Sequence, residues 1–249
     1  MRNGAVMRKI AIVLYLAGLH AAVAVLLVQG GRGGRLAARL GWREAPNLGD
    51  PRFVRIMLDC QRRQDGNIPD GAAIFIGDSL VQGLCVAGVA PNAVNLGIAG
   101  DTTAGVLQRL PAHPALARAG VIVLAVGIND VGVLPHREIV RNWEAIAGRL
   151  PPGVPVIFCA VLPVDERVKP GWRGLNRDVI QPLNRELEAR VRNRLGSRWV
   201  DAGPRLADAA GQLRAEFHDG DGLHLNSAGN AVWIAELRAA LAAAAGGGP

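Results

Sequence analysis

One serine of this sequence stands where an apolar run ends, in "AAIFIGDSLVQG" at residues 72–83. The chain contains only two other serines, Ser197 in a polar turn and Ser227 just ahead of a helical pattern. A serine hydroxyl becomes a nucleophile when an imidazole takes its proton and an acid orients that imidazole. Ser79 is therefore either a helix cap, a position that Ser and Asp favour, or a nucleophile at the end of a strand.

A histidine and acids for this chemistry occur together near the C-terminus, in "FHDGDGLHLNSAGN" at residues 217–230. Asp219 and Asp221 precede His224 by five and three residues. A three-residue separation in a glycine-containing turn lets a carboxylate fold back onto the imidazole of the same loop. The spacing predicts Asp221 as the acid that supports His224, and Asp219 as a turn residue that faces solvent.

Acyl transfer through a serine also needs donors that stabilise a tetrahedral oxyanion. The backbone N–H groups of Ser79 and Gly100 and the side-chain amide of Asn129 are the candidates, because each follows an apolar run. Glycine at position 100 allows close approach of the backbone. The G-x-S-x-G turn of α/β-hydrolases is absent, since position 81 is not glycine.

The elements that must position these residues are short apolar runs alternating with longer amphipathic stretches. The runs are 73–76, 93–96, 121–126, 154–161 and 198–200, and the helical patterns are 52–64, 102–118, 136–150, 175–195 and 227–245. Continuous short apolar runs are typical of strands buried on both faces, and the alternation predicts a parallel sheet with crossover helices. The sequence therefore predicts one three-layer α/β sandwich whose site lies beyond the carboxyl ends of the strands.

Four segments, "FIGDSLVQG", "NLGIAGDTTAGVLQRL", "LAVGIND" and "DGLHLN", resemble the four sequence blocks of the GDSL, or SGNH, hydrolase family. The resemblance is ordered along the chain and covers about residues 72 to 240. It implies a flavodoxin-like sheet of five parallel strands. It also implies Ser79 as nucleophile, Asp221 and His224 as the rest of a triad, and Gly100 and Asn129 as oxyanion-hole partners of Ser79.

The second block most resembles the platelet-activating-factor acetylhydrolase-like branch, whose members favour short acyl groups. The resemblance thus implies a serine esterase for short-chain acyl esters of small molecules, lipids or glycans, with no cofactor. Two positions depart from the family pattern: Ile128 stands where a smaller or polar residue is frequent, and Leu225 where proline commonly follows the histidine. Both departures touch the wall of the expected pocket.

Two other classes of function compete with the esterase. His218, Asp219, Asp221 and His224 form a cluster dense enough for a metal-dependent hydrolase, although no standard metal spacing such as H-E-x-x-H is present. The other competing class is a membrane-tethered binding module that keeps the fold but catalyses no reaction. Chelator treatment separates the esterase from the metalloenzyme, and labelling of Ser79 separates it from the binding module.

The N-terminus carries the excess charge and a candidate membrane span. The formal net charge is +7, but residues 1–43 hold seven basic and no acidic side chains, so the remainder is neutral and a nucleic-acid-binding stripe is not supported. Residues 10–28 are free of charged side chains and would span about 28 Å as a helix. We expect an uncleaved anchor with the domain outside the cytoplasm; a cleaved signal peptide and a secreted or periplasmic protein are the alternative.

These observations divide the chain into an anchor or signal sequence (1–30), a linker (31–48), a hydrolase domain (49–245) and a short tail (246–249). Several further residues have simpler structural interpretations. Asp78, Asp101, Asp130 and Ser227 are expected to cap helices, His113 and His136 to lie at the surface, and Trp143, Trp233 and Cys159 to lie in the core. The sequence gives no indication of the oligomeric state.

Overall fold

The five strands form a single parallel sheet in the order β2-β1-β3-β4-β5. This arrangement is taken from a computed structural model of the chain, which describes residues 50–192, 194 and 196–245. The strands are β1 (Ala73–Gly77), β2 (Ala93–Gly97), β3 (Val121–Ala125), β4 (Val156–Cys159) and β5 (Ser197–Val200). The predicted parallel α/β sheet is confirmed.

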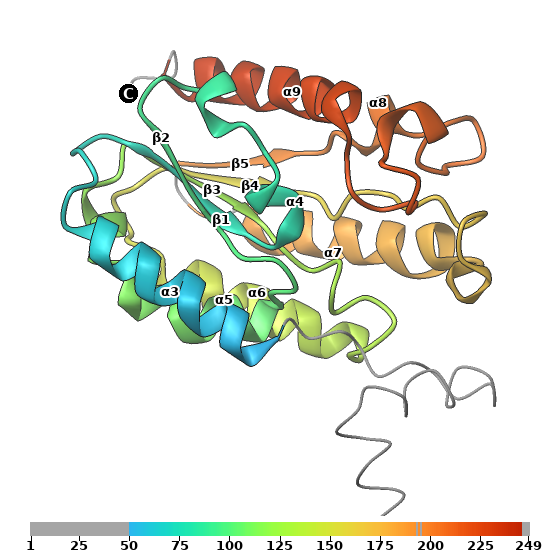
Figure 1. Ribbon diagram of the computed structural model, residues 1–249, viewed down its shortest axis with the longest axis horizontal. Helices are drawn as coiled ribbons and strands as arrows, with labels where there is room; N and C mark the ends of the chain where they lie inside the picture. Colours follow the sequence, from blue (N-terminus) through green and yellow to red (C-terminus); the bar gives the residue numbers. More distant parts are fainter. Residues whose placement is uncertain (1–49, 193, 195, 246–249) are drawn as a thin grey trace, which may run out of the picture. The chain divides into compact units, whose positions relative to one another are not determined.

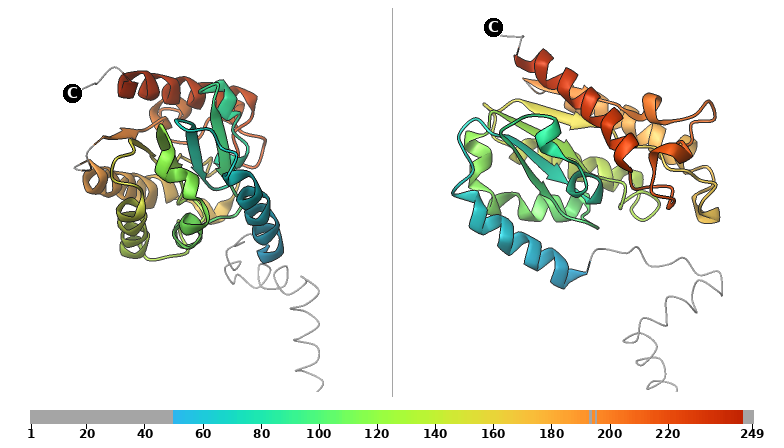
Figure 2. Two further views of the ribbon diagram at one scale, coloured as in Figure 1. Left: turned by 90° about the vertical axis from the view of Figure 1, so that its left-hand side faces the viewer. Right: turned by 45° about the horizontal axis from the view of Figure 1, so that its top comes forward.

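Helices cover both faces of the sheet (Figures 1 and 2). One face carries α3 (Pro51–Asp65), α5 (Thr103–Arg109), α6 (His136–Arg149) and α7 (Gln181–Val191), and the other carries α4 (Ser79–Gln82) and α9 (Ser227–Ala245). The short α8 (Gly203–Leu206) packs beside α9. Short 3₁₀ turns lie at Val86–Gly88, Leu110–Ala112, Pro114–Arg118, Pro170–Trp172 and Ala215–Phe217.

The core lies between these layers and is anchored by one tryptophan on each face. Every residue of β1 is buried, as expected for a strand covered on both sides. Trp143 of α6 and Trp233 of α9 are both almost fully buried, which confirms their predicted place in the core. The Trp143 ring lies 5.8 Å from that of Phe158 on β4. Cys159 is buried as predicted, and burial raises the pKa of its thiol to about 12.

The three strands that precede the predicted site end at the same level. Gly77 at the end of β1 is in register with Gly97 of β2 and Ala125 of β3. Glycine is required at both positions, because a Cβ on Gly77 would lie 2.0 Å from the carbonyl oxygen of Ala125 and one on Gly97 would lie 2.4 Å from the backbone nitrogen of Gln82. The close approach seats α4 directly on the ends of the strands.

Some predicted elements are shorter in the structure. The helix expected over 102–118 ends as α5 at Arg109, and the rest forms 3₁₀ turns because Pro111 and Pro114 interrupt the pattern. The helix expected over 175–195 begins with a π-helical turn at Asn176–Ile180 and continues as α7 to Val191. The strand expected over 154–161 covers only Val156–Cys159.

Three of the four predicted helix caps are wrong. Asp78 does cap α4, because its carboxylate accepts the N–H of Leu80 at 3.0 Å. At α5, however, the cap is Thr102 and not Asp101, and the Thr102 hydroxyl accepts the N–H of Gly105.

At α9 the side chain of Asn226, and not that of Ser227, accepts the first free N–H groups, from Ala228 and Gly229. Asp130 does not cap the helix that follows it. Its carboxylate instead reaches across to Thr103 at the start of α5.

The predicted anchor at 1–30 and linker at 31–48 lie outside the described residues, as does the tail at 246–249. Within the described part of the chain, no helix is both long and apolar enough to cross a membrane. The domain boundaries therefore stay predictions from the sequence.

Candidate active site

Ser79 lies at the first position of α4, immediately after β1, and is half-buried. Its Oγ is 2.9 Å from Nε2 of His224, which precedes α9 and is 145 residues further along the chain. The fold therefore joins the two parts of the sequence that were predicted to meet. The hydroxyl has an imidazole nitrogen within the distance that proton transfer requires.

The other ring nitrogen of His224 faces Asp221. Nδ1 of His224 is 2.5 Å from Oδ2 of Asp221. The second carboxylate oxygen, Oδ1, accepts the backbone N–H groups of Leu223 and His224, both at 2.9 Å. The loop thus folds the carboxylate back onto the imidazole of the same turn, and Ser79, His224 and Asp221 form one hydrogen-bonded chain.

The hydrogen bonds to Asp221 favour its ionised form. Burial raises the pKa of this carboxyl, but the His224 side chain and the two backbone N–H groups lower it more, to about 2. Asp221 is therefore a carboxylate at neutral pH. A fixed negative charge beside Nδ1 keeps the proton on that nitrogen and leaves Nε2 free to accept one from Ser79.

Asp219 has a different place in the loop. It is exposed, and its backbone N–H donates to the carbonyl of His224 at 3.0 Å. His218 is buried and directs its ring nitrogens toward backbone amides and Asp165. Among the described residues no group of three or more His, Cys, Asp or Glu side chains is arranged to hold a metal ion. The cluster considered for a metalloenzyme does not assemble as one.

The predicted oxyanion donors lie at the ends of three adjacent strands. Ser79 follows β1, Gly100 follows β2 and Asn129 follows β3, and these strands end in register. Gly100 has a φ of 76°, a conformation that favours glycine. Within the described residues, neither the N–H of Ser79 nor that of Gly100 has a hydrogen-bond partner. Both are available to a ligand.

The amide of Asn129 is oriented by the loop that follows β2. Its Nδ2 donates to the backbone carbonyl of Asp101 at 2.8 Å, which uses one of its two N–H bonds. Asp101 is itself fixed by Arg109, whose Nε lies 2.7 Å from the carboxylate. Arg109 also donates to the carbonyl of Gly77 at 3.1 Å. One buried guanidinium therefore ties together the ends of β1 and β2.

Two further buried acids lie beside these donors. Asp78 is 2 % exposed, and burial raises its pKa to about 7, with the nearby Asp101 and Asp130 adding to the shift. Burial also raises the pKa of Asp130 to about 6, against the opposing hydrogen bonds from Thr103. On this side of the site, burial therefore raises the pKa of both carboxyl groups well above the ordinary value for aspartate.

His113, expected at the surface, is 2 % exposed. Its Nε2 lies 3.4 Å from Arg109 and its Nδ1 lies 3.6 Å from the carboxylate of Asp65 on α3. Burial and the charge of Arg109 lower its pKa to about 4, so the ring is neutral. The prediction was wrong because the two prolines beside His113 form 3₁₀ turns that return the chain to the core. His136 is only partly exposed and pairs with Glu186.

The residues that the sequence analysis missed are those that hold other residues of the site in place. Arg109 was recognisable in principle, because it lies three residues after Val106 and one before Leu110, on the buried face of the helical pattern. His218 carried no such signal, since its contacts depend on how a glycine-rich loop folds. The two residues that depart from the family pattern, Ile128 and Leu225, are both buried.

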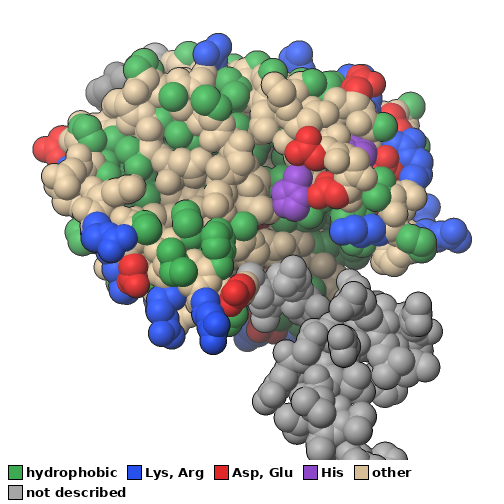
Figure 3. Space-filling model, viewed as in Figure 1, with side chains coloured by type: hydrophobic (Ala, Val, Ile, Leu, Met, Phe, Trp, Pro, Cys, Tyr) green, Lys and Arg blue, Asp and Glu red, His purple; other side chains and the backbone are tan. Residues whose placement is uncertain are grey.

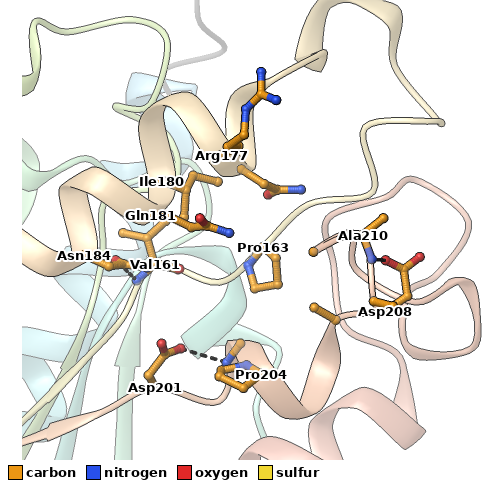
Figure 4. Close-up of a pocket in the computed structure, with 15 residues that line it drawn as sticks. Val161, Pro163, Arg177, Ile180, Gln181, Asn184, Asp201, Pro204, Asp208 and Ala210 are labelled. Carbon is orange, nitrogen blue, oxygen red and sulfur yellow. Dashed lines mark hydrogen bonds between the residues drawn. The ribbon is translucent and has the colours of Figure 1, made fainter.

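A cavity of about 600 Å³ lies away from the Ser79–His224 pair, beyond the ends of β4 and β5 (Figure 4). Its walls include Val161, Ile180, Gln181, Asp201 and Pro204, and none of the predicted site residues lines it. On the face shown in Figure 3, by contrast, histidine and acidic side chains gather together. Chemistry rather than size identifies the candidate site, because, in the part of the chain that the structure describes, only the Ser79 region brings a nucleophile, a base and free donors together.

The parallel five-stranded sheet and the serine that follows its first strand define an α/β protein with a candidate nucleophile at the carboxyl ends of its strands. The model of the GDSL-like Lipase/Acylhydrolase family matches residues 75–232, which is more than half of the chain. The chain belongs to this family and is a GDSL-type ester hydrolase. Among curated proteins, no sequence matches it.

Solved structures agree with this assignment. A structure from Streptococcus pneumonia, provisionally described as a platelet activating factor, is 28% identical with a TM-score of 0.68, over 76% of this chain and 93% of that one. A GDSL-like lipase from Bacteroides thetaiotaomicron is 19% identical with a TM-score of 0.63, over 77% and 99% of the two chains. The lipase/acylhydrolase from Enterococcus faecalis is 19% identical with a TM-score of 0.55, over 68% and 96%. The last two share the fold.

Proposed function

We propose that the chain is a serine esterase that cleaves short-chain acyl esters through Ser79, His224 and Asp221. The observation that carries the proposal is the continuous hydrogen-bonded chain from the Ser79 hydroxyl through both ring nitrogens of His224 to the Asp221 carboxylate. Each atom in this chain has the partner that nucleophilic catalysis requires.

In the first half of the reaction, Ser79 Oγ attacks the carbonyl carbon of the ester while Nε2 of His224 takes the hydroxyl proton. Asp221 stabilises the imidazolium that forms. The carbonyl oxygen becomes an oxyanion and accepts hydrogen bonds from the N–H groups of Ser79 and Gly100 and from the second N–H of the Asn129 amide. Collapse of this intermediate breaks the ester bond, and the leaving alcohol takes the proton from His224.

In the second half, water attacks the acyl-serine ester. Nε2 of His224 takes a proton from the water as the new bond forms, and the same three donors stabilise the second oxyanion. The proton then returns to Ser79 Oγ as the acid product leaves. No metal or cofactor takes part in any of these steps.

The proposed preference for short acyl groups is supported by the resemblance of the second sequence block to the acetylhydrolase-like branch. The solved structure with 28% identity is described as a platelet activating factor, in line with that branch. We expect faster turnover of two-carbon than of ten-carbon p-nitrophenyl esters, and the reverse order would contradict this part of the proposal.

A fluorophosphonate probe tests the serine chemistry directly, because it forms a covalent bond with an activated serine. The full-length chain should be labelled at Ser79, as located by peptide mass spectrometry. Ser227→Ala provides the matched control and should label normally, whereas Ser79→Ala should not label. An unlabelled wild-type chain would favour the non-catalytic binding module, and loss of esterase activity on chelation would favour the metalloenzyme.

We also propose that residues 1–30 anchor the enzyme in a membrane with its catalytic domain outside the cytoplasm, a proposal supported by the sequence alone. The full chain should remain with the membrane after alkaline carbonate washing, whereas a cleaved chain would be released. Deleting residues 1–43 should give an active protein in the soluble fraction. If the truncated chain does not fold, the apolar segment belongs to the domain.

A further inference from the structure

The loop that carries both Asp221 and His224 is folded around a second histidine, His218. The His218 side chain is only 4 % exposed, although the loop lies at the surface. A short antiparallel bridge between His218 and Leu225 closes the loop at its base. Two glycines, Gly220 and Gly222, lie between His218 and His224, so the loop has few side chains of its own to fix its course.

His218 accepts two backbone hydrogen bonds at one ring nitrogen. The N–H groups of Gly220 and Gly222 point to Nδ1 at 3.0 and 3.2 Å. These two amides lie on either side of Asp221. Because both neighbours are donors, Nδ1 must carry a lone pair and no proton, and a neutral ring then bears its hydrogen on Nε2.

The Nε2–H of His218 faces a carboxylate that other residues keep charged. Nε2 lies 3.4 Å from Oδ2 of Asp165, and Arg167 donates to both oxygens of that carboxylate, at 2.7 and 3.1 Å. The Arg167 hydrogen bonds lower the pKa of Asp165. The backbone N–H of Asp165 also donates to the carbonyl of Gly222 at 2.8 Å. Gly222 is thus fixed at both its N–H and its C=O.

We propose that His218 is a positioning residue, which fixes Asp221 against His224 by accepting the two amides that bracket Asp221. The inference rests on the proposed triad, since it explains how the acid of that triad is placed. His218 touches neither Ser79 nor His224 through its ring, so it acts only through the loop. Displacement of reacting groups by about 1 Å can lower a rate by about 10²-fold.

Two substitutions separate the two ring nitrogens. His218→Asn places a carbonyl oxygen where Nδ1 lies and so keeps an acceptor for Gly220 and Gly222. His218→Gln reaches the position of Nε2 but leaves the two amides without an acceptor. We expect kcat within about threefold of wild type for His218→Asn and about 10- to 100-fold lower for His218→Gln, with KM within about threefold in both.

The comparison of kcat with KM distinguishes positioning from a general effect on folding, and thermal unfolding of both variants provides the control. Equal kcat values for the two variants at equal stability would overturn the proposal. A second measurement needs no substitution: nitrogen-15 NMR of the wild-type chain should show Nδ1 of His218 unprotonated and Nε2 protonated. The opposite tautomer would also overturn it.

Ser79→Ala is measured in the same assay to keep the two proposals distinguishable. If Ser79→Ala retains activity, the proposed triad fails. If Ser79→Ala is inactive while His218→Gln has a wild-type kcat, the triad stands and the role of His218 is wrong.

Discussion

The two halves of the active site are built in different ways. Ser79, Gly100 and Asn129 follow strands that end in register, and the charged pair beside them, Asp101 and Arg109, is only 4 and 3 % exposed. The base and its acid lie instead on a surface loop, where the side chains of His224 and Asp221 are 44 and 39 % exposed. The strand half is positioned by the sheet and the loop half by hydrogen bonds of its own.

This difference appears in the electrostatics. On the strand side, burial raises the pKa of Asp78 to about 7. On the loop side, burial also acts to raise the pKa of Asp221, but its hydrogen bonds prevail and lower it to about 2. Burial at the strand ends therefore raises the pKa of Asp78 toward neutral pH, whereas the hydrogen bonds of the loop keep Asp221 a carboxylate. The same fold provides an environment of each kind, and the catalytic acid lies in the one that keeps it charged.

The largest expected effect comes from the residue that joins the two halves. Ser79→Ala should lower kcat for a short acyl ester by about 10⁴- to 10⁶-fold, because the nucleophile is lost. Steady-state kinetics with p-nitrophenyl acetate measure the change, and Ser227→Ala is the matched control. If Ser79→Ala kept a tenth of the wild-type kcat, the covalent mechanism would be excluded.

Within the loop half, the two neighbouring acids should differ strongly. Asp221→Asn should lower kcat by more than about tenfold, and by up to about 10⁴-fold, because Asn cannot stabilise the imidazolium of His224. Asp219→Asn is the control, since only the Asp219 backbone contacts His224, and it should have a much smaller effect. If kcat fell strongly for Asp219→Asn but stayed near the wild-type value for Asp221→Asn, the loop would fold differently from the arrangement described.

Within the strand half, Asn129→Ala should lower kcat by about 10²- to 10³-fold and leave KM within a few fold, the pattern of a donor used mainly in the transition state. The substitution also frees the carbonyl of Asp101, so the thermal unfolding of the variant is measured beside its kinetics. A change confined to KM would instead make Asn129 a substrate-binding residue.

The sequence predicts the functional residues of the strand half better than it predicts the residues that hold them in place. Strand ends can be located from apolar runs, and parallel strands bring their carboxyl ends together, so Ser79, Gly100 and Asn129 could be placed at one edge of the sheet from the sequence. The contact between Asp221 and His224 could also be predicted, because the two residues are only three positions apart in one turn.

The missed residues depend on contacts between distant segments. Asp130 was expected to cap its own helix, but it bonds to Thr103, 27 residues away. The interaction of His218 with Asp165 joins residues 53 positions apart. Helical or strand periodicity reports which face of an element is buried, but it does not report which polar partner that face meets. The polar contacts that support the site could therefore be identified only from the structure.

The last prediction tests the electrostatic difference between the halves through the stability of the protein. The raised pKa of Asp78 means that the folded state keeps a proton that the unfolded state releases above its ordinary value of 3.8. Stability from this group is therefore fully present below about pH 4 and is lost as the pH rises through about 7. The pKa change corresponds to about 4 kcal/mol. Asp78→Asn should remove most of this loss, because its amide cannot ionise.

Urea unfolding between pH 4.5 and 8 measures the change in the free energy of unfolding. This range lies above the pH at which the protonation of Asp221 affects stability. Asp221 has the opposite sign: its lowered pKa gives stability that is present above about pH 4 and is lost as the pH falls toward about 2. Asp59→Asn, a substitution at an exposed acid of α3, serves as the control and should keep the wild-type pH dependence. His113 and Asp130 also titrate in this range, but they do so in both proteins, so the difference between the wild type and Asp78→Asn reports on Asp78 alone. If the free energy of unfolding of Asp78→Asn had the same dependence on pH from 4.5 to 8 as that of the wild type, the strand half would not favour a neutral Asp78. The contrast between the two halves would then be one of geometry alone.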